Sequence, residues 1–222
     1  MNGCLVCKSA VKGDELFCKE CSKFALVSVR TCRYCGAFVP VPVDKRCRSC
    51  KGKTLYFDLI YSSFIYCGAV ESAVSMMKYG KIRHYAEVMG DHLAKDVPEC
   101  ITEGRTVIFP PMRFLDKFKR SFNQAEIMAE KIAVRHGLKI DPGLIRKVKR
   151  TEPQASLSYE KRQINLRDAF RLTKSAENGK FVLVDDVCTT FSTINTISKL
   201  LKDNGAQSVT AVTFARTSRY FS

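Results

Sequence analysis

Eight cysteines, arranged as four Cys-x-x-Cys pairs within the first 50 residues, constrain how this chain can fold. Two residues between cysteines let both sulfurs reach one metal ion from a tight turn. Two such turns complete the tetrahedral four-sulfur shell of a structural zinc site. Four pairs at near-even spacing therefore predict one or two structural Zn²⁺ ions. The expected ligands are Cys4, Cys7, Cys18, Cys21, Cys32, Cys35, Cys47 and Cys50.

The spacing leaves two pairings open. Sequential pairing joins the first two pairs in one site and the last two in another, whereas cross-braced pairing joins the first pair with the third. Disulfides and plain buried cysteines are the alternatives to zinc, and disulfides conflict with a reducing compartment. We expect a cytoplasmic protein without a membrane span. The start of the chain lacks the features of a signal peptide, and the uncharged run from Leu59 to Val70 is too short to cross a bilayer.

The pattern of residues divides the chain near residue 52. Residues 1–52 are poor in apolar periodicity, and a module of that size usually needs a metal or disulfides to fold. Residues 53–222 alternate strand-like and helix-like segments, which predicts an α/β domain with a mostly parallel sheet and flanking helices. The expected strands are Asp58–Tyr66, Thr106–Pro110, Leu144–Lys149, Phe181–Asp185 and Ser208–Phe214, and the expected helices are Ala69–Tyr79, Tyr85–Lys95, Asn123–His136, Tyr159–Asp168 and Ser192–Asn204.

The charge of the chain indicates a polyanionic partner. The formal net charge is +15, and residues 1–53 contribute 11 basic against 4 acidic side chains. Basic groups in this module can neutralise phosphates, and its aromatic side chains can stack on unpaired bases. Single-stranded DNA is therefore an expected partner. The alternative is that the aromatic residues close a small core and the lysines are simply solvated.

The segment from Lys180 to Ile194 carries the strongest signal for a ligand. Phe181 to Val184 form a continuous apolar run, typical of a strand buried on both faces, and Asp185 and Asp186 follow directly. A turn rich in hydroxyl groups then opens a helix, where backbone N–H groups can bind a phosphate. The two carboxylates can hold ribose hydroxyls or a magnesium ion. A helix N-cap at Thr190 or Ser192 is the alternative, but it does not explain two adjacent acids.

This segment resembles the phosphoribosyl-pyrophosphate (PRPP) motif of type I phosphoribosyltransferases. The resemblance implies that Asp185 and Asp186 face the ribose hydroxyls of PRPP, which is bound with Mg²⁺. It also implies that the loop from Cys188 through Thr189, Thr190, Phe191 and Ser192 to Thr193 cradles the 5-phosphate. The family usually has glycine where this chain has Phe191, and glycine permits a positive φ.

A second strand-to-helix junction follows the expected strand Thr106–Pro110. In a phosphoribosyltransferase it corresponds to the pyrophosphate loop, where preplaced cations and backbone donors stabilise the charge of the leaving group. The alternative is a solvated basic loop. The residues implied at this loop are Pro111, Met112, Arg113, Lys119 and Arg120.

The order of motifs along nearly the whole chain is similar to that of the ComF family. Those motifs are the cysteine pairs, K-Y-G, F-N-Q, T-x-P-Q…L…R-x-x-N…A-F and V-D-D-V-x-T-T; the family typically has glycine where this chain has Ser121. Membership implies a link to DNA uptake in natural transformation, with a DNA-uptake helicase or recombination protein as a further partner. Additional polar site candidates from these motifs are Lys78, Asn123, Gln124, Gln154, Arg162 and Asn165.

Two functions stay open at this point. The first is transfer of a phosphoribosyl group from PRPP to an unidentified acceptor. The second is non-catalytic binding of single-stranded DNA or a phosphoribosyl ligand on a retained fold, which the two replaced glycines and the positive charge favour.

Overall fold

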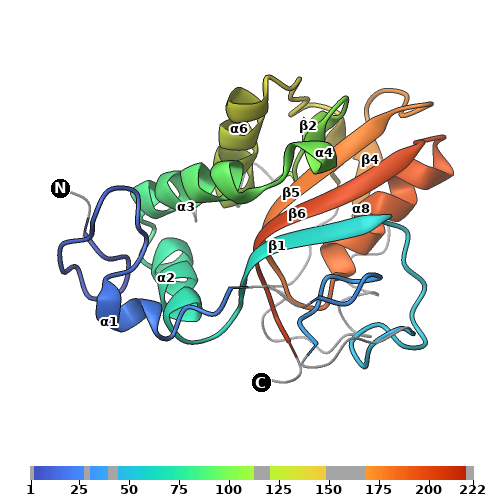
Figure 1. Ribbon diagram of the computed structural model, residues 1–222. Coiled ribbons are helices and arrows are strands. Elements are labelled where there is room, and N and C mark those ends of the chain that lie inside the picture. Colours follow the sequence, from blue (N-terminus) through green and yellow to red (C-terminus); the bar gives the residue numbers. More distant parts are fainter. Residues whose placement is uncertain (1–2, 28–30, 40–44, 113–120, 149–168, 219–222) are drawn as a thin grey trace.

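A four-stranded parallel sheet forms the centre of the protein. The computed structural model describes residues 3–27, 31–39, 45–112, 121–148 and 169–218. The strands are β1 (Leu59–Ile65), β2 (Thr106–Ile108), β5 (Lys180–Cys188) and β6 (Ser208–Arg216), in the spatial order β1-β6-β5-β2 (Figure 1). Every pairing is parallel, so the carboxyl ends of all four strands meet at one edge. This arrangement confirms the expected α/β fold.

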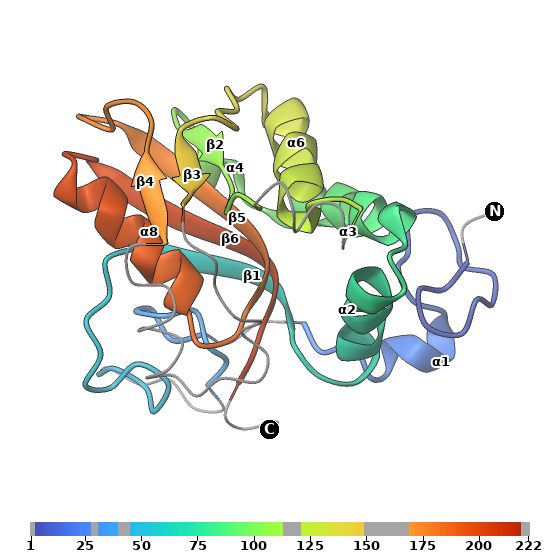
Figure 2. The same ribbon diagram turned by 180° about the vertical axis from the view of Figure 1, so that it is seen from behind.

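Alternation along the central strands builds a core on each face of the sheet. Val182 and Val184 of β5 pack into one hydrophobic cluster, and Phe181 and Leu183 pack into the other. The first cluster contains the buried sides of α2 (Gly68–Tyr79), α3 (Arg83–Asp96) and α6 (Gln124–His136). The second contains that of α8 (Ser192–Asp203). Figures 1 and 2 show α8 on one side of the sheet and the other three helices grouped apart from it.

Several elements differ from the sequence-based expectations. The strand expected near residue 145 forms as β3 (Ile145–Lys147), but it pairs antiparallel with β4 (Phe170–Leu172) in a separate small sheet. Two short helices, α1 (Lys19–Ser22) and α4 (Glu99–Thr102), were not expected. The helix expected at 159–168 lies outside the described residues. Among the described residues, none of the helices has the length and apolar character that crossing a bilayer requires.

The eight N-terminal cysteines form two tetrads by sequential pairing. Within each tetrad the four sulfurs all lie within 4.8 Å of one another. The Cys7–Cys18 sulfur distance is 3.5 Å and the Cys35–Cys47 distance is 3.6 Å. Zinc–sulfur bonds of about 2.3 Å in a tetrahedron place the sulfurs about 3.8 Å apart. The donor set therefore fits structural zinc in both tetrads, the first made of Cys4, Cys7, Cys18 and Cys21 and the second of Cys32, Cys35, Cys47 and Cys50.

The two tetrads pack against different cores. Cys4 and the neighbouring Phe17 belong to the cluster of α2 and α3, and the Phe17 ring meets Phe64 of β1 edge-on. Cys7 of this tetrad is exposed. All four cysteines of the second tetrad are buried, and they belong to the cluster that contains α8. The second tetrad is therefore more deeply buried than the first.

Asn195 of α8 fastens the segment that leaves the second tetrad. Its side-chain oxygen accepts a hydrogen bond from the backbone N–H of Tyr56 at 2.8 Å, and its amide nitrogen donates to the carbonyl of Thr54 at 2.9 Å. Only 6% of Asn195 is exposed. The side chain therefore replaces backbone partners that this irregular segment lacks.

We expect one zinc ion for each tetrad, with unequal effects on stability. Cys21→Ser should remove one zinc and leave thermal unfolding of the sheet domain nearly unchanged, because this ligand lies at a half-exposed module. Cys35→Ser should remove one zinc and lower the melting temperature clearly, because its tetrad is part of the α8 core and structural zinc contributes directly to folding. Elemental analysis and circular dichroism check both results; equal melting temperatures in the two variants would contradict the unequal roles.

Asn195→Ala should lower the free energy of unfolding by about 1–2 kcal/mol, since it leaves a partly buried donor and acceptor without partners. Asn204→Ala serves as the matched control. Asn204 also donates one side-chain hydrogen bond, to Leu200, but it is exposed at the end of α8, so we expect a change within about 0.5 kcal/mol. Urea unfolding followed by circular dichroism measures both, and equal losses would show that the Asn195 bonds do not fasten the segment.

Candidate functional site

The two adjacent acids lie where the sheet meets the loop that leads to α8. Asp185 and Asp186 fall within the last four residues of β5, because this strand runs to Cys188 and is longer than the sequence pattern indicated. The extension follows from the length of β6, which pairs with β5 up to Cys188 opposite Arg216. Both acids therefore sit on rigid backbone at the edge where ligands of open parallel sheets bind.

Asp186 forms an ion pair with Lys78 of α2. The Lys78 ammonium lies 2.8 Å from an Asp186 carboxylate oxygen, and 8% of Asp186 is exposed. Burial by itself lowers the pKa of Lys78, but the charge and hydrogen bond of Asp186 outweigh it, so the pKa lies above the usual lysine value. Lys78 is therefore a fixed positive charge beside the acids. The lysine of the K-Y-G motif thus lies beside the acids, although it is far from them in sequence.

Asp185 has a different environment from its neighbour. Burial, followed by the nearby charge of Asp186, raises its pKa to about 8. One of its oxygens accepts the backbone N–H of Asp186 at 2.9 Å. Such a carboxyl is poised to ionise when a cation or a hydroxyl donor arrives, because either would compensate the lost solvation.

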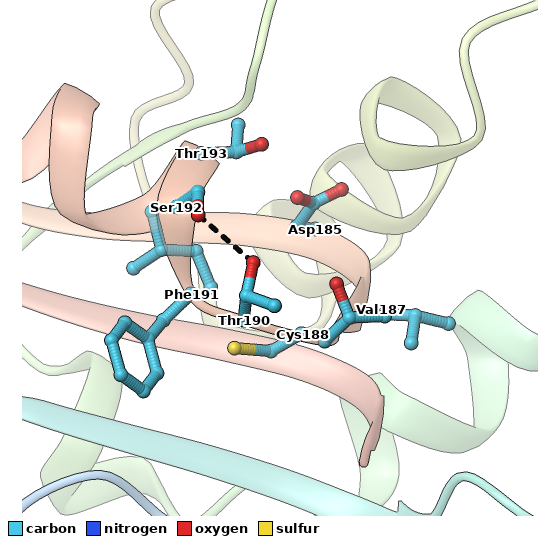
Figure 3. A pocket seen from close by; sticks show the side chains of 9 residues that line it. Asp185, Val187, Cys188, Thr190, Phe191, Ser192 and Thr193 are labelled. Carbon is cyan, nitrogen blue, oxygen red and sulfur yellow. Dashed lines mark hydrogen bonds between the residues drawn. The ribbon is translucent and has the colours of Figure 1, made fainter. Parts of the chain in front are cut away.

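The loop after β5 surrounds a small pocket. Figure 3 shows Asp185 on one side and the hydroxyl-bearing residues Thr190, Ser192 and Thr193 around it. The hydroxyls of Thr190 and Ser192 lie 2.9 Å apart in a hydrogen bond. Neither is the N-cap of α8, because the helix begins at Ser192 and Phe191 occupies the cap position. The capping alternative therefore does not account for these hydroxyls.

Phe191 has the left-handed backbone conformation that glycine prefers. Its φ is 52° and its ψ is 13°. Its side chain is 2% exposed and packs edge-on against Phe57, with ring centroids 6.1 Å apart. Figure 3 shows the ring directed away from Asp185. The other replaced glycine position, Ser121, also has a positive φ, of 68°. Phe191 and Ser121 therefore adopt a strained backbone conformation, which costs about 1–2 kcal/mol for each residue.

Arg216 contacts this loop although sequence reasoning missed it. It closes β6 and is 2% exposed. Its guanidinium donates to the carbonyl oxygens of Cys188, at 2.7 Å, and Thr189. The signal in the sequence was one arginine directly after the apolar strand pattern of residues 208–215, a position where a buried charge needs partners.

The second junction is only partly described. Pro111 and Met112 follow β2 and are half-buried. Asn123 caps α6: its side chain accepts the N–H of Ala125 at 3.2 Å and donates to the carbonyl of Pro110 at 3.1 Å, so it ties this helix to the loop after β2. Gln124 is buried beside it. The remaining candidates, Arg113, Lys119, Arg120, Gln154, Arg162 and Asn165, lie outside the described residues.

Comparison with known proteins agrees with this arrangement. A family model described as "Phosphoribosyl transferase domain" matches residues 88–220. The DNA utilization protein YhgH of Salmonella typhimurium is 28% identical over 207 residues, which cover 90% of each chain. Competence protein F of Haemophilus influenzae is 33% identical over 113 residues, which cover 50% of this chain and 49% of that one.

Among solved structures, the glutamine PRPP amidotransferase from B. subtilis, complexed with ADP and GMP, is 19% identical. The match has a TM-score of 0.40 and covers 57% of this chain and 25% of that one. The family model alone spans more than half of the chain, and the match to YhgH covers 90% of it. The chain therefore belongs to the phosphoribosyl transferase domain family and, within it, to the ComF family.

Proposed function

We propose that this protein binds PRPP with Mg²⁺ at the carboxyl edge of its sheet and acts as a phosphoribosyltransferase-type protein in the uptake or use of DNA. The observation that carries the proposal is the sequence of groups at the end of β5. Two acids on rigid backbone are followed at once by a hydroxyl-lined turn that opens a 12-residue helix. Acids beside a hydroxyl-lined turn are the groups that would bind the hydroxyls and the phosphate of a ribose 5-phosphate.

The acids are assigned to the ribose. Asp185 and Asp186 would accept hydrogen bonds from two adjacent ribose hydroxyls, and carboxylates together with phosphate oxygens are the ligands that Mg²⁺ prefers. Bound Mg²⁺ would supply charge neutralisation for the pyrophosphate group. Lys78, 2.8 Å from Asp186, holds that side chain in place beside Asp185 before a ligand binds.

The loop from Cys188 to Thr193 is assigned to the 5-phosphate. Its hydroxyls line the pocket together with Asp185, and the amino end of α8 adds the favourable end of a helix dipole. The left-handed conformation of Phe191 supports this assignment, because the turn keeps the shape that a glycine would give it. Pro111 and Met112, with the basic residues Arg113, Lys119 and Arg120, are assigned to the pyrophosphate group.

The biological setting comes from the relatives. Those with the highest coverage are named DNA utilization proteins, and another is named competence protein F. We therefore propose a cytoplasmic role in DNA uptake and natural transformation. The partners would be single-stranded DNA and a helicase or recombination protein. PRPP binding would justify a search for the acceptor of the phosphoribosyl group.

PRPP binding tests the assignment of the acids directly. In calorimetric titrations with PRPP and Mg²⁺, zinc-loaded protein should show saturable binding. Asp185→Asn and Asp186→Asn should each weaken it at least about tenfold, since each removes a charge-assisted hydrogen bond. Asp203→Asn is the matched control, because Asp203 is an exposed acid paired with Lys199 at the far end of α8. Wild-type affinity in the Asp185→Asn and Asp186→Asn variants, with unchanged thermal melts, would refute the ribose assignment.

The second candidate function is binding of single-stranded DNA without catalysis, which the net charge of +15 favours. It predicts an affinity that falls steeply with salt, with a slope of about −0.7 for each phosphate contact. Arg48→Gln with Lys51→Gln, at the exposed rim of the second tetrad, should reduce that slope by roughly 0.7 for each lost contact. Lys139→Gln with Lys180→Gln, near the amino edge of the sheet, should not. Fluorescence anisotropy with a labelled oligonucleotide measures these slopes, and binding insensitive to salt would exclude this function.

A further inference from the structure

Arg216 contacts two parts of the protein that are far apart in sequence. On one side its guanidinium donates to the carbonyls of Cys188 and Thr189 in the loop after β5. On the other side its Nε donates to the carbonyl of Cys35, at 3.3 Å, in a turn of the second cysteine tetrad. Because Arg216 is 2% exposed, these carbonyls replace the water that would otherwise solvate its charge.

The carbonyls of Cys188 and Thr189 are held in one direction by Arg216 and, beside it, by Thr217, whose backbone N–H donates to Cys188 at 3.1 Å and whose hydroxyl donates to Thr189 at 2.8 Å. In a trans peptide the C=O and the N–H lie on opposite sides of the chain, and none of the described peptide bonds is cis. Holding the carbonyls of Cys188 and Thr189 toward Arg216 therefore turns the N–H groups of Thr189 and Thr190 to the other side of the loop. Backbone N–H groups with fixed direction are what a bound phosphate needs.

Phe191 adds a second connection between the same two parts. Its ring lies beneath the Arg216 guanidinium, with Cζ 5.3 Å from the ring centroid. It also lies 4.8 Å from the ammonium of Lys53 and edge-on to Phe57, both in the segment that leaves the tetrad. A glycine at this position would leave the turn possible but would remove all three contacts. The strained phenylalanine thus joins the loop to the tetrad segment.

The tetrad end of this connection is itself held firmly. Gly36, next to Cys35, has a φ of 64°, and a Cβ on it would meet the carbonyl oxygen of Ile60 at 2.7 Å. The turn therefore lies directly on β1, and its sulfurs belong to the same hydrophobic cluster as Cys188 and Phe191. A metal ion that fixes the Cys35 turn consequently fixes the carbonyl that Arg216 contacts.

We propose that Arg216 is a positioning residue that couples metal binding at Cys32, Cys35, Cys47 and Cys50 to the order of the phosphate loop at residues 188–193. The inference rests on the proposed function insofar as the loop binds the phosphate of PRPP. The consequence is that metal occupancy of the second tetrad changes the affinity of the loop for its ligand. By thermodynamic linkage, a ligand that orders the loop also raises the affinity of this tetrad for the metal.

Hydrogen–deuterium exchange tests the coupling without any ligand. The protein is the zinc-loaded full chain, and the variant is Arg216→Lys, which keeps the charge but loses the planar fork of donors. Amides of residues 189–195 should exchange about tenfold faster in this variant, the loss expected for one charge-assisted hydrogen bond. Amides of β2 and α6 serve as an internal reference for global unfolding. Arg105→Lys is the matched control, because Arg105 donates to Ser208 at the opposite edge of the sheet. Wild-type exchange of the loop in Arg216→Lys would overturn the proposal.

Zinc release then separates positioning from a purely structural role. The full chain with Cys7→Ser leaves the second tetrad as the measured site, and a colorimetric chelator reports its loss of zinc. PRPP with Mg²⁺ should lower the fraction of zinc that the chelator removes at equilibrium in this background and should have no effect once Arg216→Lys is added. PRPP affinity should fall about tenfold in Arg216→Lys, again one charge-assisted hydrogen bond. If Arg216→Lys binds PRPP as tightly as wild type, or ligand still protects its zinc from the chelator at equilibrium, the positioning role is wrong. If wild type does not bind PRPP at all, the proposed function fails, and hydrogen exchange alone decides the coupling.

Discussion

The parallel pairing of β5 with β6 fixes where the polar groups of this protein lie. Because both strands run in the same direction and pair as far as Cys188 and Arg216, their last residues come side by side at one edge of the sheet. Asp185 and Asp186 arrive there on one strand and Arg216 on the next. The loops and the helix α8 begin from that edge. A single hydrogen-bonded ladder therefore gathers acids, a buried cation and a helix terminus within one small region.

Two adjacent acids at a partly buried edge lose solvation and repel each other, and the structure compensates this cost differently for each acid. Asp186 is neutralised by Lys78, which reaches it from α2. Asp185 has no equally close described cation, and burial together with its neighbour raises its pKa to about 8. The two acids thus have different surroundings, one paired with a cation and the other buried beside its neighbour. Such divergence is common where carboxylates handle a cation or hydroxyl groups.

The two cysteine tetrads have the same ligand pattern but different physical settings. The first packs beside α2 and α3 and leaves Cys7 exposed, whereas the second is buried in the core beneath α8. Cysteine spacing is nearly the same in both, with 10 residues between the pairs of the first tetrad and 11 between those of the second, and it says nothing about this difference. It arises because the chain leaves the second tetrad through Tyr56 and Phe57, which Asn195 and Phe191 hold against α8.

Local patterns along the chain were enough to predict the class of fold, the cysteine ligand set and the acidic strand end. These depend on local rules: Cys-x-x-Cys spacing, apolar runs of strand length and hydroxyls at the start of a helix. Four features emerged only in the folded protein: the pairing of the tetrads, the separate β3–β4 sheet, the ion pair of Lys78 with Asp186 and the contacts of Arg216. The contacts involved join residues from 11 positions apart, for Cys7 and Cys18, to 181 positions apart, for Arg216 and Cys35. No local pattern encodes such a contact, because it exists only once the strands have paired and the helices have packed on their faces.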